Sequence, residues 1–125
     1  MFNKSHRILV KNEVEIMEVQ TPKEFFEKSL PERFKPEKAA GIDVIVQLSL
    51  NGANGGDWVV NIKDQKIAMR EGTDPSATLT LKATDKDFMD VVNKKISAEK
   101  AFFTGRLHFK GNLSLALKLR EAGIL

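Results

Sequence analysis

The chain has 125 residues, with 20 Lys and Arg against 17 Asp and Glu and no cysteine. This length predicts one domain, and the lack of cysteine excludes disulfides, thiol nucleophiles and thiolate metal sites. The net charge of +3 is mixed in sign along the chain and there is no Tyr, so the clustered cations and stacking aromatics of a nucleic-acid binder are missing. No segment approaches a membrane span, and the N-terminus lacks the apolar run of a signal peptide, so we expect a soluble cytoplasmic protein.

The first helical signal follows an N-terminal stretch of about 20 residues. TPKE, residues 21–24, has the pattern of a capping box with proline at the first helical position. Phe25, Phe26 and Leu30 would form the apolar side of this helix. We expect the helical region to end at Gly41.

Alternation of apolar and polar residues then predicts strands. They cover residues 42–50, 58–62, 66–70 and 77–83. Because short loops rich in turn-forming residues separate these strands, the pattern implies an antiparallel meander with one covered face. The glycines of the first loop, NGANGG, are not followed by the Lys-Ser/Thr of a phosphate-binding loop, so we interpret them as turn residues.

Helical periodicity returns at residue 84. Phe88 and Val92 lie on the apolar side of a helix over residues 84–95, and a second short helix follows over 97–103. RLHFK, residues 106–110, alternates again and predicts a fifth strand. The order of elements predicts an α+β fold: a mostly antiparallel five-stranded sheet with helices on one face.

The last segment fits two structures. Its leucines at 113, 115, 117 and 119 alternate as in a strand, but Leu and Ala are strong helix formers, and Asn112 and Gly123 stand at cap positions. We predict a helix. Its apolar arc would cover about 200°, roughly twice what packing on one sheet face requires. The excess must contact another helix, another subunit or a ligand, and the pattern does not decide among them.

Groups suited to catalysis are scarce. The two histidines, His6 and His108, lie far apart, and His108 alternates with inward residues and should face solvent. Asp85, Asp87 and Asp90 fall near a helix start, where carboxylates favour the dipole. We therefore expect no enzyme activity, no metal and no cofactor.

Three stretches together resemble the sterol carrier protein 2 family of lipid-binding domains. They are GDWVVNIKDQKIAM, DPSATLTLKATDKDFMDVVNKK and, most closely, AFFTGRLHFKGNLSLALKL at residues 101–119. The resemblance covers about residues 21–125 and leaves residues 1–20 as an N-terminal extension. Many relatives have glycine where Asp64-Gln65 and Asn93 stand here, but Asn and Asp tolerate turn and cap conformations.

The resemblance implies a hydrophobic cavity partly closed by the C-terminal helix. It implies non-enzymatic binding of a fatty acid, a fatty acyl-CoA or a sterol-like lipid, and leaves open its intracellular transfer. The alternative is an accessory module that presents a lipid-like intermediate to a partner enzyme. Candidate ligand-binding residues are Phe25, Phe88, Val92, Phe102, Phe103, Leu113, Ala116, Leu117 and Leu119, each equally compatible with a core role.

Basic residues near the C-terminal helix could contact a lipid head group or an anionic membrane. They are Lys110, Lys118 and Arg120, for which a solvated face is the simpler interpretation. The oligomeric state cannot be predicted from these patterns.

Overall fold

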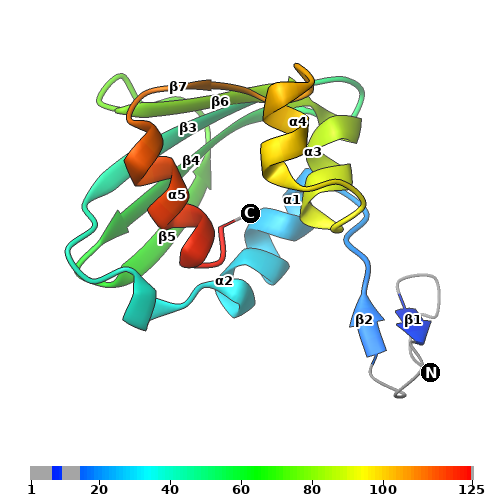
Figure 1. Cartoon of the computed structure of the whole chain (residues 1–125), viewed down its shortest axis with the longest axis horizontal. Coiled ribbons are helices and arrows are strands. Elements are labelled where there is room, and N and C mark those ends of the chain that lie inside the picture. Colours follow the sequence, from blue (N-terminus) through cyan, green and yellow to red (C-terminus); the bar gives the residue numbers. More distant parts are fainter. Residues whose placement is uncertain (1–6, 10–14, 125) are drawn as a thin grey trace.

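A computed structural model describes residues 7–9 and 15–124 of the chain. The described strands are β1 (Arg7–Leu9), β2 (Glu15–Met17), β3 (Val44–Asn51), β4 (Gly56–Lys63), β5 (Lys66–Glu71), β6 (Leu79–Thr84) and β7 (His108–Lys110). The helices are α1 (Pro22–Glu24), α2 (Leu30–Arg33), α3 (Asp85–Val92), α4 (Ala98–Phe103) and α5 (Leu113–Glu121). A π-helical turn (Phe25–Ser29) joins α1 to α2, and a 3₁₀ turn (Pro36–Lys38) follows α2. Figure 1 shows this arrangement.

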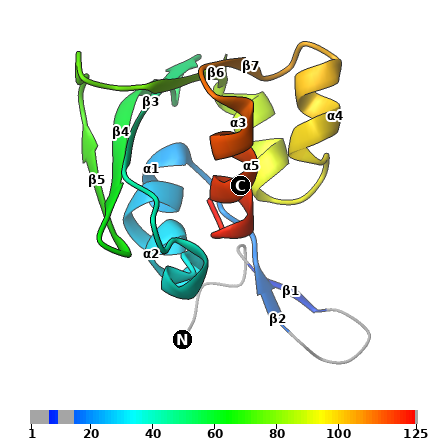
Figure 2. The ribbon, with the colours of Figure 1, turned by 60° about the vertical axis from the view of Figure 1, so that its left-hand side comes forward.

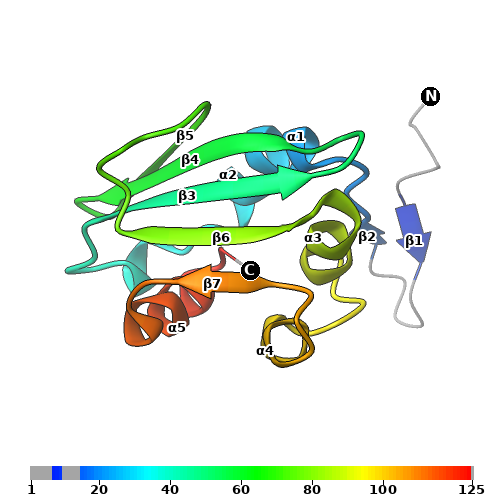
Figure 3. The ribbon, with the colours of Figure 1, turned by 90° about the horizontal axis from the view of Figure 1, so that it is seen from above.

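Five strands form the main sheet in the order β5-β4-β3-β6-β7. The sheet curves around the helices (Figure 2), and its strand order is visible from above (Figure 3). All neighbouring strands are antiparallel except β3 and β6, which run parallel. The predicted fold class, a mostly antiparallel five-stranded sheet with helices, is therefore confirmed.

The predicted meander, however, is wrong at β6. This strand does not pair with β5; it pairs with β3, with Val46 opposite Leu79. Residues 72–78 must therefore carry the chain across the sheet between β5 and β6. Gln47, which points away from the helices because it alternates with the buried Val46 and Leu48, holds this segment through hydrogen bonds to Gly72 O (3.1 Å) and from Asp74 N (2.9 Å).

The outer face of the sheet is also partly buried. Val59 points to this face, opposite to its neighbours Trp58 and Val60, yet only 2% of it is exposed. Gln47 satisfies its amide within this layer, so its burial leaves no polar atom unpaired. Alternation along β3 and β4 predicts the inner face correctly, but it does not reveal that a loop covers part of the outer one.

Aromatic side chains join the first helices to the sheet. Phe26 stacks on Trp58 of β4 with ring centroids 4.7 Å apart and on Phe88 of α3 at 5.6 Å, while Phe25 meets Phe88 edge to face at 5.5 Å. All these rings are buried. Thr21 accepts a hydrogen bond from Glu24 N (3.1 Å), so the predicted helix start at residue 21 is confirmed.

In two turns, residues other than glycine adopt the left-handed backbone conformation. Asp64 and Gln65 both have positive φ in the β4–β5 hairpin. At the end of α3, Asn93 is the cap residue with φ −90°, and the left-handed conformation falls on Lys94.

The N-terminal region contributes a small separate ladder. β1 and β2 pair antiparallel and lie away from the main sheet (Figure 1). Val19, just beyond them, is buried in the core. His6 and most of the predicted extension lie outside the described residues, and the division of the chain at residue 20 remains a prediction.

Candidate functional site

Helix α5 has one face packed on the protein and another left uncovered. The side chain of Asn112 accepts a hydrogen bond from Leu115 N (3.1 Å), and Gly123 has φ +95° beyond the other end, so the prediction of a helix is confirmed. Leu119 and Ala122 are buried, whereas 56% of Leu113 and 47% of Leu117 are exposed. Protein contacts therefore account for only part of the wide apolar arc.

The uncovered face of α5 borders a groove shared with α4. The two helices flank β7 (Figures 1 and 3). A cavity of about 300 Å³ lies between them, at the lower end of the range of about 300–1,000 Å³ for small-molecule sites. We call it the α4–α5 groove. Its lining consists of Leu81, Ala98, Glu99, Phe102, Phe103, Leu107, Phe109, Leu113, Ala116, Leu117 and Arg120.

The groove gathers the large exposed apolar side chains of the part of the chain whose burial is described. Within residues 18–124, four large apolar side chains are exposed: Phe102 (40%), Phe103 (82%), Leu113 (56%) and Leu117 (47%). All four line the groove. A contiguous exposed apolar patch is unfavourable in water and typically marks a binding surface.

A second, inner cavity of about 70 Å³ lies behind the groove, between the sheet and the first helices. It is lined by Phe25, Phe26, Val46, Leu48, Val60, Leu79, Leu81, Phe88, Phe109, Ala116, Leu119, Arg120 and Ile124. Leu81, Phe109, Ala116 and Arg120 line both cavities. These four side chains therefore form the boundary between the groove and the inner space.

A third hollow, of about 310 Å³, lies beside β4 and β5. Charged side chains make up half of its lining: Glu27, Arg70 and Glu71 stand beside Phe26, Trp58 and Met69. Small-molecule sites are predominantly apolar, so the α4–α5 groove is the better candidate.

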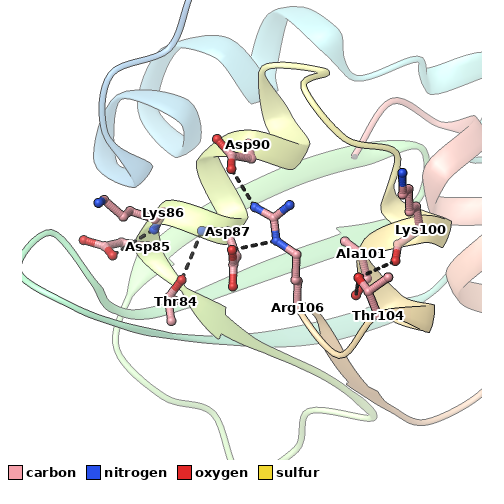
Figure 4. Close-up of polar contacts among 9 residues, drawn as sticks. All are labelled: Thr84, Asp85, Lys86, Asp87, Asp90, Lys100, Ala101, Thr104 and Arg106. Carbon is pink, nitrogen blue, oxygen red and sulfur yellow. Dashed lines mark hydrogen bonds and ion pairs between the residues drawn. The ribbon is translucent and has the colours of Figure 1, made fainter.

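Polar contacts fix α4 and the segment that follows it. Ser97 caps α4 by accepting a hydrogen bond from Lys100 N (3.1 Å). Arg106, between α4 and β7, donates to Asp87 (2.8 Å) and Asp90 (2.6 Å) of α3, as Figure 4 shows. These hydrogen bonds raise the pKa of Arg106. The carboxylates of α3 thus serve to hold the wall of the groove in place.

One ion pair bridges the groove. Arg120 of α5 contacts Glu99 of α4. Both side chains line the groove, and they are the two charged members of its lining. The chemistry available inside the groove is therefore apolar contact, with charge at a single bridging pair.

Most of the residues predicted for ligand binding come together at these cavities. Phe102, Phe103, Leu113, Ala116 and Leu117 line the groove, and Phe25, Phe88, Ala116 and Leu119 line the inner cavity. Val92 is fully buried in the core and lines neither. The sequence-based set of ligand-binding residues lacks Leu81 of β6 and Phe109 of β7, which line both cavities. The alternation that places both side chains on the inner face of the sheet could have indicated them.

Other kinds of site find little support in the described residues. His108 is exposed, as predicted. Among residues 7–9 and 15–124, no group of three or more His, Asp or Glu side chains is placed to hold a metal ion. In that part of the chain, no helix has the length and apolar character needed to cross a membrane.

Comparison with known proteins gives a family match over most of the chain. The model of the "SCP-2 sterol transfer family" matches residues 23–122. Sterol carrier protein 2 of Homo sapiens is 34% identical over 70 residues, which are 56% of this chain and 13% of that protein. Hydroxysteroid dehydrogenase-like protein 2 of Mus musculus is 32% identical over 87 residues, 68% of this chain and 18% of that protein. The chain thus spans less than a fifth of the length of these two relatives.

Solved structures share the fold at lower identity. The solution structure of palmitated SCP2L2 from Aedes aegypti has a TM-score of 0.64 at 22% identity, over 82% of this chain and 93% of that one. The sec-alkylsulfatase Pisa1 from Pseudomonas sp. has a TM-score of 0.72 at 21% identity, over 82% of this chain and 16% of that one. At such identities these likenesses show the fold alone.

Proposed function

Because the chain belongs to the SCP-2 sterol transfer family, we propose that it binds the apolar part of a lipid in the α4–α5 groove, without catalysis. The observation that carries this proposal is that all four exposed large apolar side chains of residues 18–124 line one groove. A bound alkyl chain would cover the surface that protein atoms leave uncovered. The name of one structural relative, a palmitated protein of the same fold, is consistent with such a ligand.

Burial of an alkyl chain supplies enough free energy for this function. Each methylene moved out of water contributes about 0.8 kcal/mol, so about sixteen of them contribute about 13 kcal/mol. Association costs about 4–15 kcal/mol in lost freedom. The gain exceeds the cost over most of this range, so a long chain can bind without strong polar contacts. The shape of the cavity would then select among fatty acid, acyl-CoA and sterol-like ligands.

The predicted residues take distinct roles in this proposal. Phe102, Phe103, Leu113 and Leu117 contact the lipid in the groove, and Ala116 stands where the groove meets the inner cavity. Phe25, Phe88 and Leu119 line the inner end of the site, and Val92 supports it from the core. Lys110 and Lys118 are exposed near the groove, and their transient contact with an anionic membrane remains a prediction, as does a cytoplasmic location.

A second candidate function is presentation of a lipid-like intermediate to an enzyme. The observation that favours it is that both mammalian relatives are much longer than this chain, and one is named as dehydrogenase-like. A groove open to solvent could pass its ligand to a partner as readily as to a membrane.

We would test the proposal by extracting gently purified protein and identifying co-purified lipid by mass spectrometry. The wild type should release a lipid in near-stoichiometric amount. Ala116→Phe, which places a ring where both cavities meet, should lower the recovered lipid at least about tenfold because the added bulk fills the ligand's space.

Ala68→Phe is the matched control, since Ala68 is exposed on β5 and lines none of these cavities. It should retain the lipid. Equal recovery from the wild type and Ala116→Phe would contradict the proposed site, and no recovery of lipid from any preparation, even after incubation with liposomes, would contradict the function. Co-purification of an enzyme with the lipid-loaded protein would favour the second candidate.

A further inference from the structure

The two cavities of the proposed lipid site meet at a common wall. The α4–α5 groove is bordered by exposed side chains, and the inner cavity lies behind it. Leu81, Phe109, Ala116 and Arg120 line both cavities, and we call these four side chains the partition. An alkyl chain that is longer than the groove can therefore remain in contact with protein only if a member of the partition moves aside.

Three members of the partition are held in place. Leu81 is buried on β6, which is paired with β3 on one side and with β7 on the other. Ala116 has no side-chain torsion that could turn. Arg120 is joined across the groove to Glu99 of α4.

Phe109 is the fourth member, and its surroundings leave it freer to move. It lies on β7, a strand of three residues at the edge of the sheet that pairs with β6 alone. Its ring is partly buried and makes no contact with another aromatic ring of the described residues. Short elements with few buried contacts open most easily, so a turn of this ring is the least costly way through the partition.

The inner cavity has room for the end of one alkyl chain. Its volume of about 70 Å³ is about half that of the roughly 150 Å³ apolar cavities that hold a benzene ring. Its lining is apolar except for Arg120. The terminal carbons of an unbranched chain therefore suit this space, whereas a fused ring system does not.

We propose that Phe109 is a gate that determines which alkyl chains the protein encloses. Shorter chains lie in the groove while the ring keeps its place in the partition. Longer chains turn the ring aside and put their terminal carbons into the inner cavity, while the polar end stays in water at the open side of the groove. This inference rests on the proposed function, since it assumes that a lipid occupies the groove, and it names the favoured ligand: a long unbranched chain in preference to a sterol.

The first test is a series of even-numbered saturated fatty acids from octanoate to stearate, with binding measured by displacement of a fluorescent lipid. Two further methylenes that leave water tighten binding up to about 15-fold. In the wild type, the gain should fall below about threefold at one step of the series, because displacement of the Phe109 ring offsets the added contact. Phe109→Ala should remove this step. Cholesterol should bind the wild type more weakly than the acids beyond the step.

The second test detects entry into the inner cavity. Trp58 is the single tryptophan of the chain, and it stacks on Phe26, which lines the inner cavity. Bromine on the terminal carbon is similar in size to a methyl group and quenches the fluorescence of a nearby indole. Brominated acids longer than the step should lower the emission of Trp58 in the wild type, and shorter ones should not.

Two variants serve as controls. Phe102→Ala is the same substitution at a residue that lines only the groove, so it should weaken all the acids and leave the step at the same length. Phe109→Leu removes the ring with a smaller loss of buried volume, in case Phe109→Ala is too unstable to purify. It should reduce the step.

The outcomes separate the gate from lipid binding itself. A wild-type series without a step, a step unchanged by both substitutions of Phe109, or no quenching by any brominated acid would each overturn the gate and leave binding in the groove intact. Cholesterol that binds more tightly than every fatty acid would overturn the favoured ligand. If neither the acids nor cholesterol bound, the proposed function itself would be wrong.

Discussion

Asn93 helps to attach the incoming N-terminal segment to the domain. Its side chain accepts a hydrogen bond from Val19 N (2.8 Å) and donates one to Val19 O (2.8 Å), which reproduces the pairing of a strand neighbour. Asn93→Ala removes both bonds from partly buried backbone groups. We expect a loss of about 1–3 kcal/mol in the free energy of unfolding, measured by urea titration.

Asn61→Ala is a suitable comparison, because Asn61 is exposed on β4 and makes no side-chain hydrogen bond to a described residue. It should change stability by less than about 0.5 kcal/mol. If both substitutions had the same effect, the reciprocal pair with Val19 would contribute nothing specific.

At the scale of the element, α5 is held to α2 at its C-terminal end, whereas Leu113 and Leu117, nearer its start, are uncovered. Lys35 N bonds to Ala122 O, and a Cβ on Gly123 would collide with the carbonyl oxygen of Arg33. Gly123→Ala should therefore cost about 2–4 kcal/mol in the free energy of unfolding, since steric overlap adds to the left-handed backbone.

Gly105→Ala provides the matched comparison for that prediction. Gly105 has a similar φ of +79°, but a Cβ there would meet open space. Its cost should be only about 1–2 kcal/mol, from the backbone conformation alone. Similar denaturation midpoints for the two variants would show that α5 does not depend on this close approach to α2.

Prediction from sequence succeeded where local signals act and failed where distant segments meet. The caps at Thr21, Ser97 and Asn112 mark helix starts because the bonds involved span three residues. The place of β6 in the sheet depends on long-range contacts such as those of Gln47 with residues 72–74. A single polar residue in a strand pattern does not predict such contacts. For the same reason, the leucines of α5 predict an apolar arc wider than one sheet face needs, but not which segment holds the end of the helix, as Lys35 N does by donating to Ala122 O.

At the scale of the whole molecule, the elements around the site differ in how many side chains they bury, and therefore in how easily they open locally. Strands β3 and β4 bury most of their inward side chains, whereas α4 and α5 each bury one residue within the helix, Ala101 and Leu119. Helices with few buried contacts open most easily. Addition of laurate should therefore slow hydrogen exchange in α4 and α5 markedly more than in β3 and β4.

Hydrogen exchange followed by mass spectrometry would measure this difference. Ala116→Phe should show little response to laurate, since its ligand space is filled. A uniform slowing across sheet and helices would instead indicate that the ligand stabilises the fold without contacting these two helices.

The partition between the two cavities has an evolutionary consequence. The side chains that line both cavities are Leu81, Phe109, Ala116 and Arg120. A substitution at Ala116 or Phe109 could merge the compartments into one long tunnel or divide them completely. Descendants of this scaffold could thus acquire a preference for longer or shorter cargo through one or two codons, while the sheet that supports them stays unchanged.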